Sequence, residues 1–72
     1  MQSKTMKELQ PHEQRVVDEQ KELQIKFNAL FIFLEKGQPK FINDDNWRLL
    51  NWQFNAMQIY NDILKQRISL FS

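Results

Sequence analysis

Apolar side chains recur along most of this chain at the three- and four-residue spacing of an α-helix. The pattern is interrupted where the chain has its single glycine, Gly37, and its second proline, Pro39. A glycine followed by a proline is typical of a helix end, whereas the first proline, Pro11, suits the first turn of a helix because it has no N–H to leave unpaired. The pattern therefore predicts long helices over residues 11–36 and 44–71, joined by a loop over residues 37–43.

Two further start signals complete the predicted architecture. Asn43, Asp44 and Asp45 are candidate N-caps for the second long helix. Thr5 is followed three residues later by Glu8, which is a capping-box pattern and predicts a short helix over residues 3–10. We expect a single all-α domain over residues 1–72, in which this short helix precedes a long antiparallel helical hairpin.

The first long helix carries apolar residues on more than one side. One stripe comprises Val16, Leu23, Phe27, Leu30 and Leu34. The opposite side of the C-terminal half carries Ile25, Ala29, Ile32 and Phe33. A helix that is apolar all round must be buried all round, and a hairpin partner covers only one face. Because a chain of 72 residues also buries too little surface to be very stable alone, we expect a homo-oligomer.

The second long helix places a cation among apolar neighbours. Its two apolar stripes repeat every seven residues and comprise Leu49, Ala56, Ile63 and Leu70, and Leu50, Met57, Leu64 and Phe71. Gln53, Tyr60 and Arg67 lie between the two stripes on the same arc. A guanidinium in an apolar setting needs an anionic partner. The residue pattern alone favours an acidic side chain (Glu13, Glu19 or Glu22) over the phosphate of a ligand, which remains the alternative.

Composition excludes several classes of function. Ten Lys and Arg against nine Asp and Glu give a net charge of +1, which is a poor match for polymeric DNA or RNA. With no cysteine and one histidine, no metal site is expected, and the apolar run over residues 29–34 is too short to span a membrane. One glycine rules out a phosphate-binding loop, and Ser and Thr occur only near the termini. We therefore expect a cytoplasmic, non-enzymatic protein without a cofactor.

The order of particular residues resembles a known family. The chain opens its first long helix with Pro11-His12-Glu13-Gln14-Arg15-Val16, continues with Leu23 and Lys26, and ends its second with Met57, Tyr60, Leu64, Arg67 and Ile68. Over about residues 11–71 this pattern resembles the small phage proteins that act as anti-CBASS cyclic-oligonucleotide sponges. The opening motif, coupled to the late Tyr and Arg-Ile, is the most specific part of the likeness.

The resemblance implies a homohexamer that captures cyclic dinucleotides and cyclic trinucleotides without cleaving them, in the cytoplasm of an infected bacterium. The two ligand classes would occupy separate pockets between subunits, so that the messenger no longer activates the CBASS effector. Lys26 matches a position that contacts the dinucleotide, whereas Arg67 and Asn28 match the trinucleotide pocket. The remaining ligand-binding candidates by resemblance are Pro11, His12, Arg15 and Tyr60.

Two other functions remain open from the residues. A helical-hairpin module that oligomerises, or grips a partner helix through its excess apolar surface, is the main alternative. A small nucleic-acid binder is the third, although three arginines and a net charge of +1 offer little to a phosphate backbone.

Overall fold

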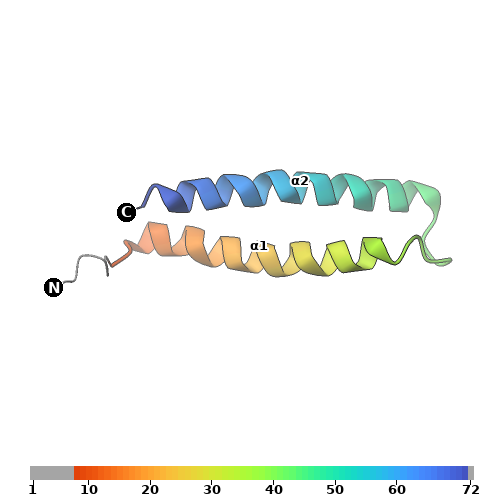
Figure 1. Cartoon of the computed structure of the whole chain (residues 1–72), viewed down its shortest axis with the longest axis horizontal. Helices are drawn as coiled ribbons and strands as arrows, with labels where there is room; N and C mark the ends of the chain where they lie inside the picture. Colours follow the sequence, from red (N-terminus) through yellow and green to blue (C-terminus); the bar gives the residue numbers. More distant parts are fainter. Residues whose placement is uncertain (1–7, 72) are drawn as a thin grey trace.

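The computed structural model describes residues 8–71, which form two α-helices: α1 (Pro11–Glu35) and α2 (Asp44–Ser69). The helices run in opposite directions side by side, so that the C-terminal end of α2 lies beside the start of α1 (Figure 1). The expectation of an all-α protein is confirmed. Most of the predicted helix over residues 3–10 lies outside the described residues, and its described part, residues 8–10, is not helical.

Local chemistry explains where α1 begins and ends. Pro11 occupies the first turn, and the backbone N–H of Gln10 donates to Glu13 Oε1 at 2.9 Å. At the other end Gly37 has a φ of +86°, a left-handed conformation that favours glycine, and its N–H donates to the carbonyl oxygen of Leu34 at 3.0 Å. The helix therefore ends at Glu35, one residue before the predicted boundary.

The connecting loop is held by side chains at the start of α2. Gln38 Nε2 donates both to the carbonyl oxygen of Ile42 and to Asp44 Oδ1, each at 2.9 Å. Asn43 is the N-cap, as the sequence predicts, because its Oδ1 accepts the backbone N–H of Asn46 at 2.8 Å. The Asn43 bond satisfies one of the N–H groups that the first turn of α2 leaves without a helical partner, and the two bonds from Gln38 tie the loop to that turn.

The C-terminal end of α2 is shorter than predicted. The helix ends at Ser69 instead of residue 71. There the backbone N–H of Leu70 donates to the Arg67 carbonyl at 3.1 Å, and that of Phe71 to the Ile68 carbonyl at 3.0 Å. Such three-residue bonds tighten a helix end into a 3₁₀-like turn.

The two helices meet along a seam with a seven-residue repeat. Its buried or half-buried members are Glu13, Val16, Gln20, Leu23, Phe27, Leu30 and Leu34 of α1, Trp47, Leu50, Phe54, Met57, Asn61, Leu64 and Ile68 of α2, and Phe71 just after α2. These alternating spacings of three and four residues are those of a coiled-coil interface. Leu64 is the most deeply buried apolar residue, at 1 % exposure, and it packs with Val16 and Leu23.

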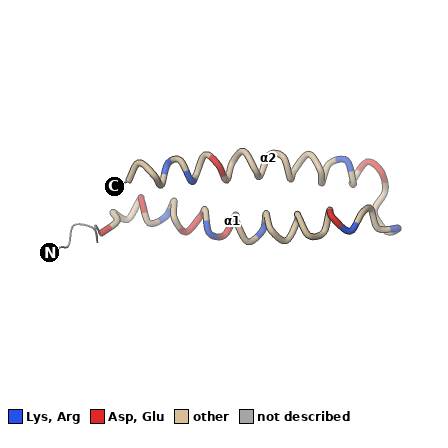
Figure 2. Tube along the Cα trace, in the orientation of Figure 1, with Lys and Arg blue, Asp and Glu red and all other residues tan. Residues whose placement is uncertain are grey.

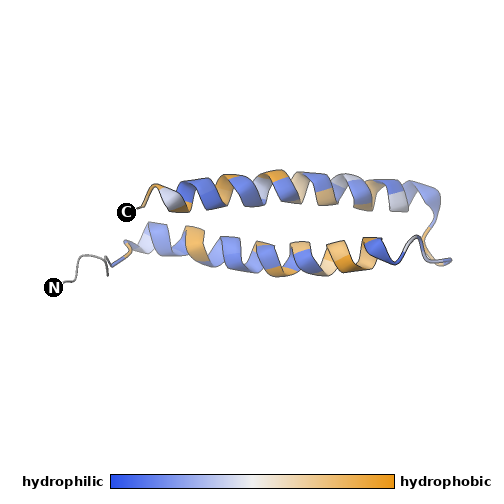
Figure 3. Cartoon of the chain, in the orientation of Figure 1, coloured by the Kyte–Doolittle hydropathy of each residue, from blue (hydrophilic) through white to orange (hydrophobic). Residues whose placement is uncertain are grey.

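Only one of the two apolar stripes predicted for α2 faces α1. That stripe contains Met57 and Leu64, and the other half of the seam comes from Phe54 and Asn61, which the stripes omit. The other predicted stripe is exposed, and with two neighbouring residues it forms the outer face of α2: Leu49, Trp52, Ala56, Ile59, Ile63 and Leu70. A lone helix pair thus leaves a second apolar surface uncovered, and Figure 3 shows apolar residues recurring along the whole of α2.

The second half of α1 is also more apolar than one seam requires. Apolar colour is concentrated there in Figure 3, and Ile25, Phe31 and Ile32 remain exposed. Phe33 differs from the expectation that it points away from α2, because its ring centroid lies 6.2 Å from that of Trp47. The large indole near the start of α2 reaches a ring that helical spacing assigns to the opposite side of α1.

Candidate ligand-binding site

All seven predicted ligand-binding residues have exposed side chains in the single chain. They are Pro11, His12, Arg15, Lys26, Asn28, Tyr60 and Arg67. Tyr60 is 43 % exposed. The seven residues lie on different sides of the helix pair, so we describe their placement by the two edges that flank the seam.

One edge of the seam is identified by contacts across it. Gln24 of α1 accepts a hydrogen bond from Asn61, and the ring of Phe31 stacks near Phe54, with centroids 5.9 Å apart. Gln24 and Phe31 are seven residues apart and therefore lie on the same edge of α1. Asn28 lies one helical turn after Gln24, so its side chain lies next to this edge, at the surface of α1. We call this side the Asn28 edge.

The opposite edge of the seam carries four of the seven candidates. On α1 it contains His12 and Lys26, which are two heptads apart, and on α2 it contains Tyr60 and Arg67, which are one heptad apart. In an antiparallel pair, equivalent heptad positions of the two helices flank the same edge of the seam. These residues therefore form a second group, the Arg67 edge, on the side of the helix pair away from Asn28.

Arg67 and Asn28 are also far apart along the helix axis. Gln20 Nε2 donates to Asn61 Oδ1 at 3.0 Å, which fixes the level at which the helices pair. Arg67 follows Asn61 by six residues, and Asn28 follows Gln20 by eight, in opposite directions. At 1.5 Å per residue their separation along the axis is about 20 Å. One chain therefore cannot bring both side chains to one small ligand.

Arg67 has no acidic partner among residues 8–71. The ion pair that the structure holds over that range joins Arg48 and Asp45, at 3.9 Å, and both side chains are exposed. The acidic partner expected in Glu13, Glu19 or Glu22 is therefore not found within the single chain. Arg67 stands exposed between the seam and the outer face of α2, and α2 has no charged residue between Arg48 and Asp62 (Figure 2).

The structure reveals a chain of amide side chains that the sequence patterns miss. Asn61 is only 3 % exposed, and its Nδ2 donates to Gln24 Oε1 at 2.8 Å. Gln20 Nε2 donates to Asn61 Oδ1, and Gln24 Nε2 donates to Asn28 Oδ1 at 2.9 Å. The four amides thus run from the buried seam to the Asn28 edge. The signal for them was the polar residues Gln20 and Asn61 at seam positions of the heptad pattern.

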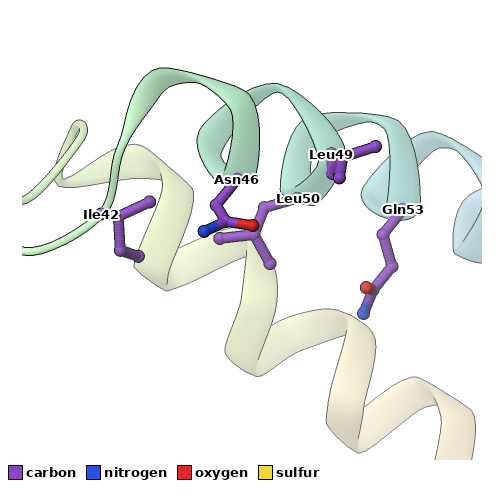
Figure 4. A pocket seen from close by; sticks show the side chains of 5 residues that line it. All are labelled: Ile42, Asn46, Leu49, Leu50 and Gln53. Atoms are coloured by element: carbon purple, nitrogen blue, oxygen red, sulfur yellow. The ribbon is translucent and has the colours of Figure 1, made fainter.

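Shallow hollows lie along α2 near its start, and the first of them reaches the edge of the seam at Leu50. One, of about 360 Å³, is lined by Ile42, Asn46, Leu49, Leu50 and Gln53 (Figure 4). The other, of about 370 Å³, is lined by Leu49, Trp52, Gln53 and Ala56. Neither contains any of the seven predicted ligand-binding residues. Because both include residues of the outer face, they fit side chains of a packing partner better than a charged ligand.

Within residues 8–71 no three His, Asp or Glu side chains gather where they could hold a metal ion. Over the same range neither helix has an apolar stretch able to cross a lipid bilayer.

The helix pair, with cations along one edge and an apolar outer face beside them, defines a small all-α binding protein. Comparison with known families identifies it further, since the model of the Sequestin family matches residues 10–70. The chain belongs to the Sequestin family, which indicates a sequestering role, with binding instead of catalysis. No curated protein and no solved structure matches the chain.

Proposed function

We propose that this protein is a cytoplasmic phage sponge that binds cyclic di- and trinucleotide second messengers without cleaving them. It acts as a homo-oligomer, a hexamer by resemblance, and it keeps CBASS effectors inactive by holding their messenger. Membership of the Sequestin family over residues 10–70 is the observation that carries this proposal. Among the described residues, Arg67 and Asn28 give it physical detail.

The placement of Arg67 supports a pocket shared between subunits. Its guanidinium is exposed in the single chain, has no acidic partner within residues 8–71, and borders the apolar outer face of α2. If copies pack through that face, the guanidinium loses water and needs an anion. A phosphodiester accepts two parallel N–H bonds from a guanidinium. A second chain would then supply Asn28, which lies about 20 Å away along the axis within one chain.

The remaining candidates fit a separate dinucleotide pocket. Lys26 is the proposed contact to the cyclic dinucleotide, and its ammonium is exposed on the Arg67 edge. Pro11, His12 and Arg15 lie at the start of α1, about 20 Å from Lys26, so they too would join it through another subunit. Tyr60 lies between these two levels and offers a ring face and a hydroxyl.

A sponge acts by mass action. It lowers the free messenger concentration only if its sites outnumber the messenger molecules and release them slowly. This requires tight binding and abundance but no bond cleavage, which agrees with the family's sequestering role. Recovery of intact cyclic ligand after release is therefore part of the test.

The decisive experiment compares two arginines of α2. Arg67→Met should retain the oligomer but lower cyclic trinucleotide affinity about 10- to 150-fold, because a hydrogen bond to a charged group contributes about 1.5–3 kcal/mol. Arg48→Met is the matched control, since Arg48 is equally part of α2 but pairs with Asp45 at an exposed site. Calorimetric titration gives the affinities and native mass spectrometry gives the assembly. Equal effects of the two substitutions, or linearised ligand on recovery, would contradict the proposal.

The exposed outer face favours one alternative, a module that oligomerises or binds a partner helix. The same variant separates the two functions. An interaction module gains or keeps stability when Arg67 becomes Met, because an apolar residue replaces a charge next to an apolar surface. It also binds no cyclic nucleotide at any concentration.

A further inference from the structure

The four linked amides have a direction. A side-chain amide has one donating end, its NH2, and one accepting end, its carbonyl oxygen. Gln20 Nε2 donates to Asn61, Asn61 Nδ2 donates to Gln24, and Gln24 Nε2 donates to Asn28. In each pair the earlier amide donates through its NH2 and the later one accepts through its carbonyl oxygen, so the series runs from Gln20 to Asn28. The last member, Asn28, receives a hydrogen bond on its Oδ1.

Burial of Asn61 couples these orientations. At 3 % exposure Asn61 has no water to replace a lost partner, so its amide can turn over only together with those of Gln20 and Gln24, which are joined to each other as well by a 3.3 Å bond from Gln20 Nε2 to Gln24 Oε1. With Asn61 Nδ2 directed at Gln24 Oε1, the Nε2 of Gln24 must turn toward Asn28. The outer bond between Gln24 and Asn28 is exposed and adds little stability, because water competes for both groups. Its main consequence is the orientation of Asn28.

The Asn28 carbonyl is thus occupied, and its NH2 makes no hydrogen bond within residues 8–71. We propose that Asn61 and Gln24 are positioning residues, which hold Asn28 as a hydrogen-bond donor toward an acceptor atom of the bound cyclic nucleotide. This inference rests on the proposed function, in which Asn28 contacts the trinucleotide. Phosphodiester oxygens accept and never donate, so an amide held with its NH2 outward has the right polarity and one held in reverse repels the ligand.

A double-mutant cycle tests the coupling, with cyclic triadenylate as the probe. Asn28→Ala should weaken binding about threefold to tenfold, the usual effect of one lost hydrogen bond. Gln24→Met should weaken it by a similar factor in the native background and by no further factor in the Asn28→Ala background. Gln58→Met is the control, because Gln58 is exposed on α2 and its amide makes no hydrogen bond among the described residues. It should leave affinity unchanged.

Two further variants separate positioning from folding. Gln24→Glu is nearly isosteric but only accepts, so Asn28 must turn its NH2 inward, and affinity should fall further than with Gln24→Met. Asn61→Leu replaces the buried amide by an apolar residue of similar size and removes the shorter of the two hydrogen bonds to Gln24 Oε1, at 2.8 Å, while that from Gln20, at 3.3 Å, is kept. It should hold or raise the midpoint of urea unfolding and still weaken binding about threefold or more, a combination that a merely structural residue would not produce.

Each result has one meaning. If Gln24→Met lowers affinity by the same factor in the native and the Asn28→Ala backgrounds, the inference is overturned, because Gln24 then acts independently of Asn28. Tight binding that Asn28→Ala leaves unchanged overturns it too, while the proposed sequestering function stands. Absence of binding by the native protein, to cyclic triadenylate and to cyclic di-adenylate alike, overturns both.

Discussion

Phe27 of α1 and Phe54 of α2 stack across the middle of the seam, with ring centroids 4.6 Å apart and ring planes 14° from parallel. Phe31 places a third ring 5.9 Å from the same Phe54. The one α2 side chain thus joins two successive turns of α1. Aromatic pairs contribute about 0.5–1.5 kcal/mol beyond the area that they bury, so this cluster is a main link between the helices on the loop side of Asn61.

Replacing Phe54 by leucine should lower the free energy of unfolding by about 1–2 kcal/mol, because both ring contacts are lost while most of the apolar bulk remains. Urea unfolding at one fixed protein concentration measures the change, since the stability of an oligomer depends on concentration. Phe41→Leu is the matched control, because Phe41 lies in the loop and is 82 % exposed. A control that costs as much as Phe54→Leu would show that the stacked rings contribute nothing particular.

Substitutions of Leu64 and Leu70 distinguish the contribution of the seam to stability from that of the outer face of α2. Leu64 is 1 % exposed in the single chain, so Leu64→Ala should cost about 2–5 kcal/mol through lost burial and the cavity left behind. Leu70 is 81 % exposed in the single chain. Leu70→Ala should therefore change only how strongly the unfolding midpoint depends on protein concentration.

The measurement for this pair is thermal unfolding by circular dichroism over a hundredfold range of concentration. The expected outcome is a lower midpoint at every concentration for Leu64→Ala and a shift confined to dilute samples for Leu70→Ala. Identical behaviour of the two variants would mean that the seam between α1 and α2 is not the core of the folded chain.

Gly37 should tolerate asparagine better than alanine. Its φ of +86° is a conformation that costs a residue with a Cβ about 1 kcal/mol, although the added atom would meet nothing within 4 Å. The strain is thus in the backbone alone, and asparagine adopts this region more readily. Urea unfolding should rank the variants as native, Gly37→Asn, then Gly37→Ala. Alanine as stable as glycine would show that the end of α1 relaxes without cost.

Helix starts and stops were predictable because they depend on nearby residues. Pro11, Asn43 and Gly37 act through their own backbone or one hydrogen bond within three residues, so their positions predict the starts of both helices and the end of α1 to within one residue. Of the short helix expected over residues 3–10, the structure describes residues 8–10, which are not helical.

The choice of seam on α2 was not predictable from hydrophobicity. Two apolar stripes of equal quality compete on that helix, and the pairing uses one of them together with Asn61, a polar residue. Asn61 belongs in the seam because Gln20 and Gln24 satisfy its amide, which is a property of two helices and not of one. For the same reason Asn28 gains its orientation only in the folded pair.

The candidate site shows a different limit. The resemblance supplies residue positions, but only the antiparallel pairing reveals that Arg67 and Asn28 lie on opposite edges, about 20 Å apart along the axis. The expectation that Arg67 meets Glu13, Glu19 or Glu22 within the chain is not met over residues 8–71. We propose that identical chains combine to complete the site, and the expected behaviour of two charged variants tests this.

A charge placed on the outer face of α2 should dissociate the protein without unfolding a single chain. Ile59 is 63 % exposed, and Ile59→Glu puts a carboxylate where a packing partner would bury it, which is strongly unfavourable. Gln58→Glu adds the same charge one residue earlier, on the side of α2 that carries the polar residues Asn55, Asp62 and Lys65. Native mass spectrometry should give a smaller assembly for Ile59→Glu and an unchanged assembly for Gln58→Glu.

The same two variants connect assembly to binding. If Arg67 and Asn28 meet only between chains, Ile59→Glu should lose cyclic trinucleotide affinity at least tenfold although it removes no proposed ligand contact, since about 1.4 kcal/mol of lost preorganisation already gives that factor. Far-ultraviolet circular dichroism checks that its helix content is retained. A monomeric Ile59→Glu that binds as tightly as the native protein would contradict a pocket that Arg67 and Asn28 share between chains.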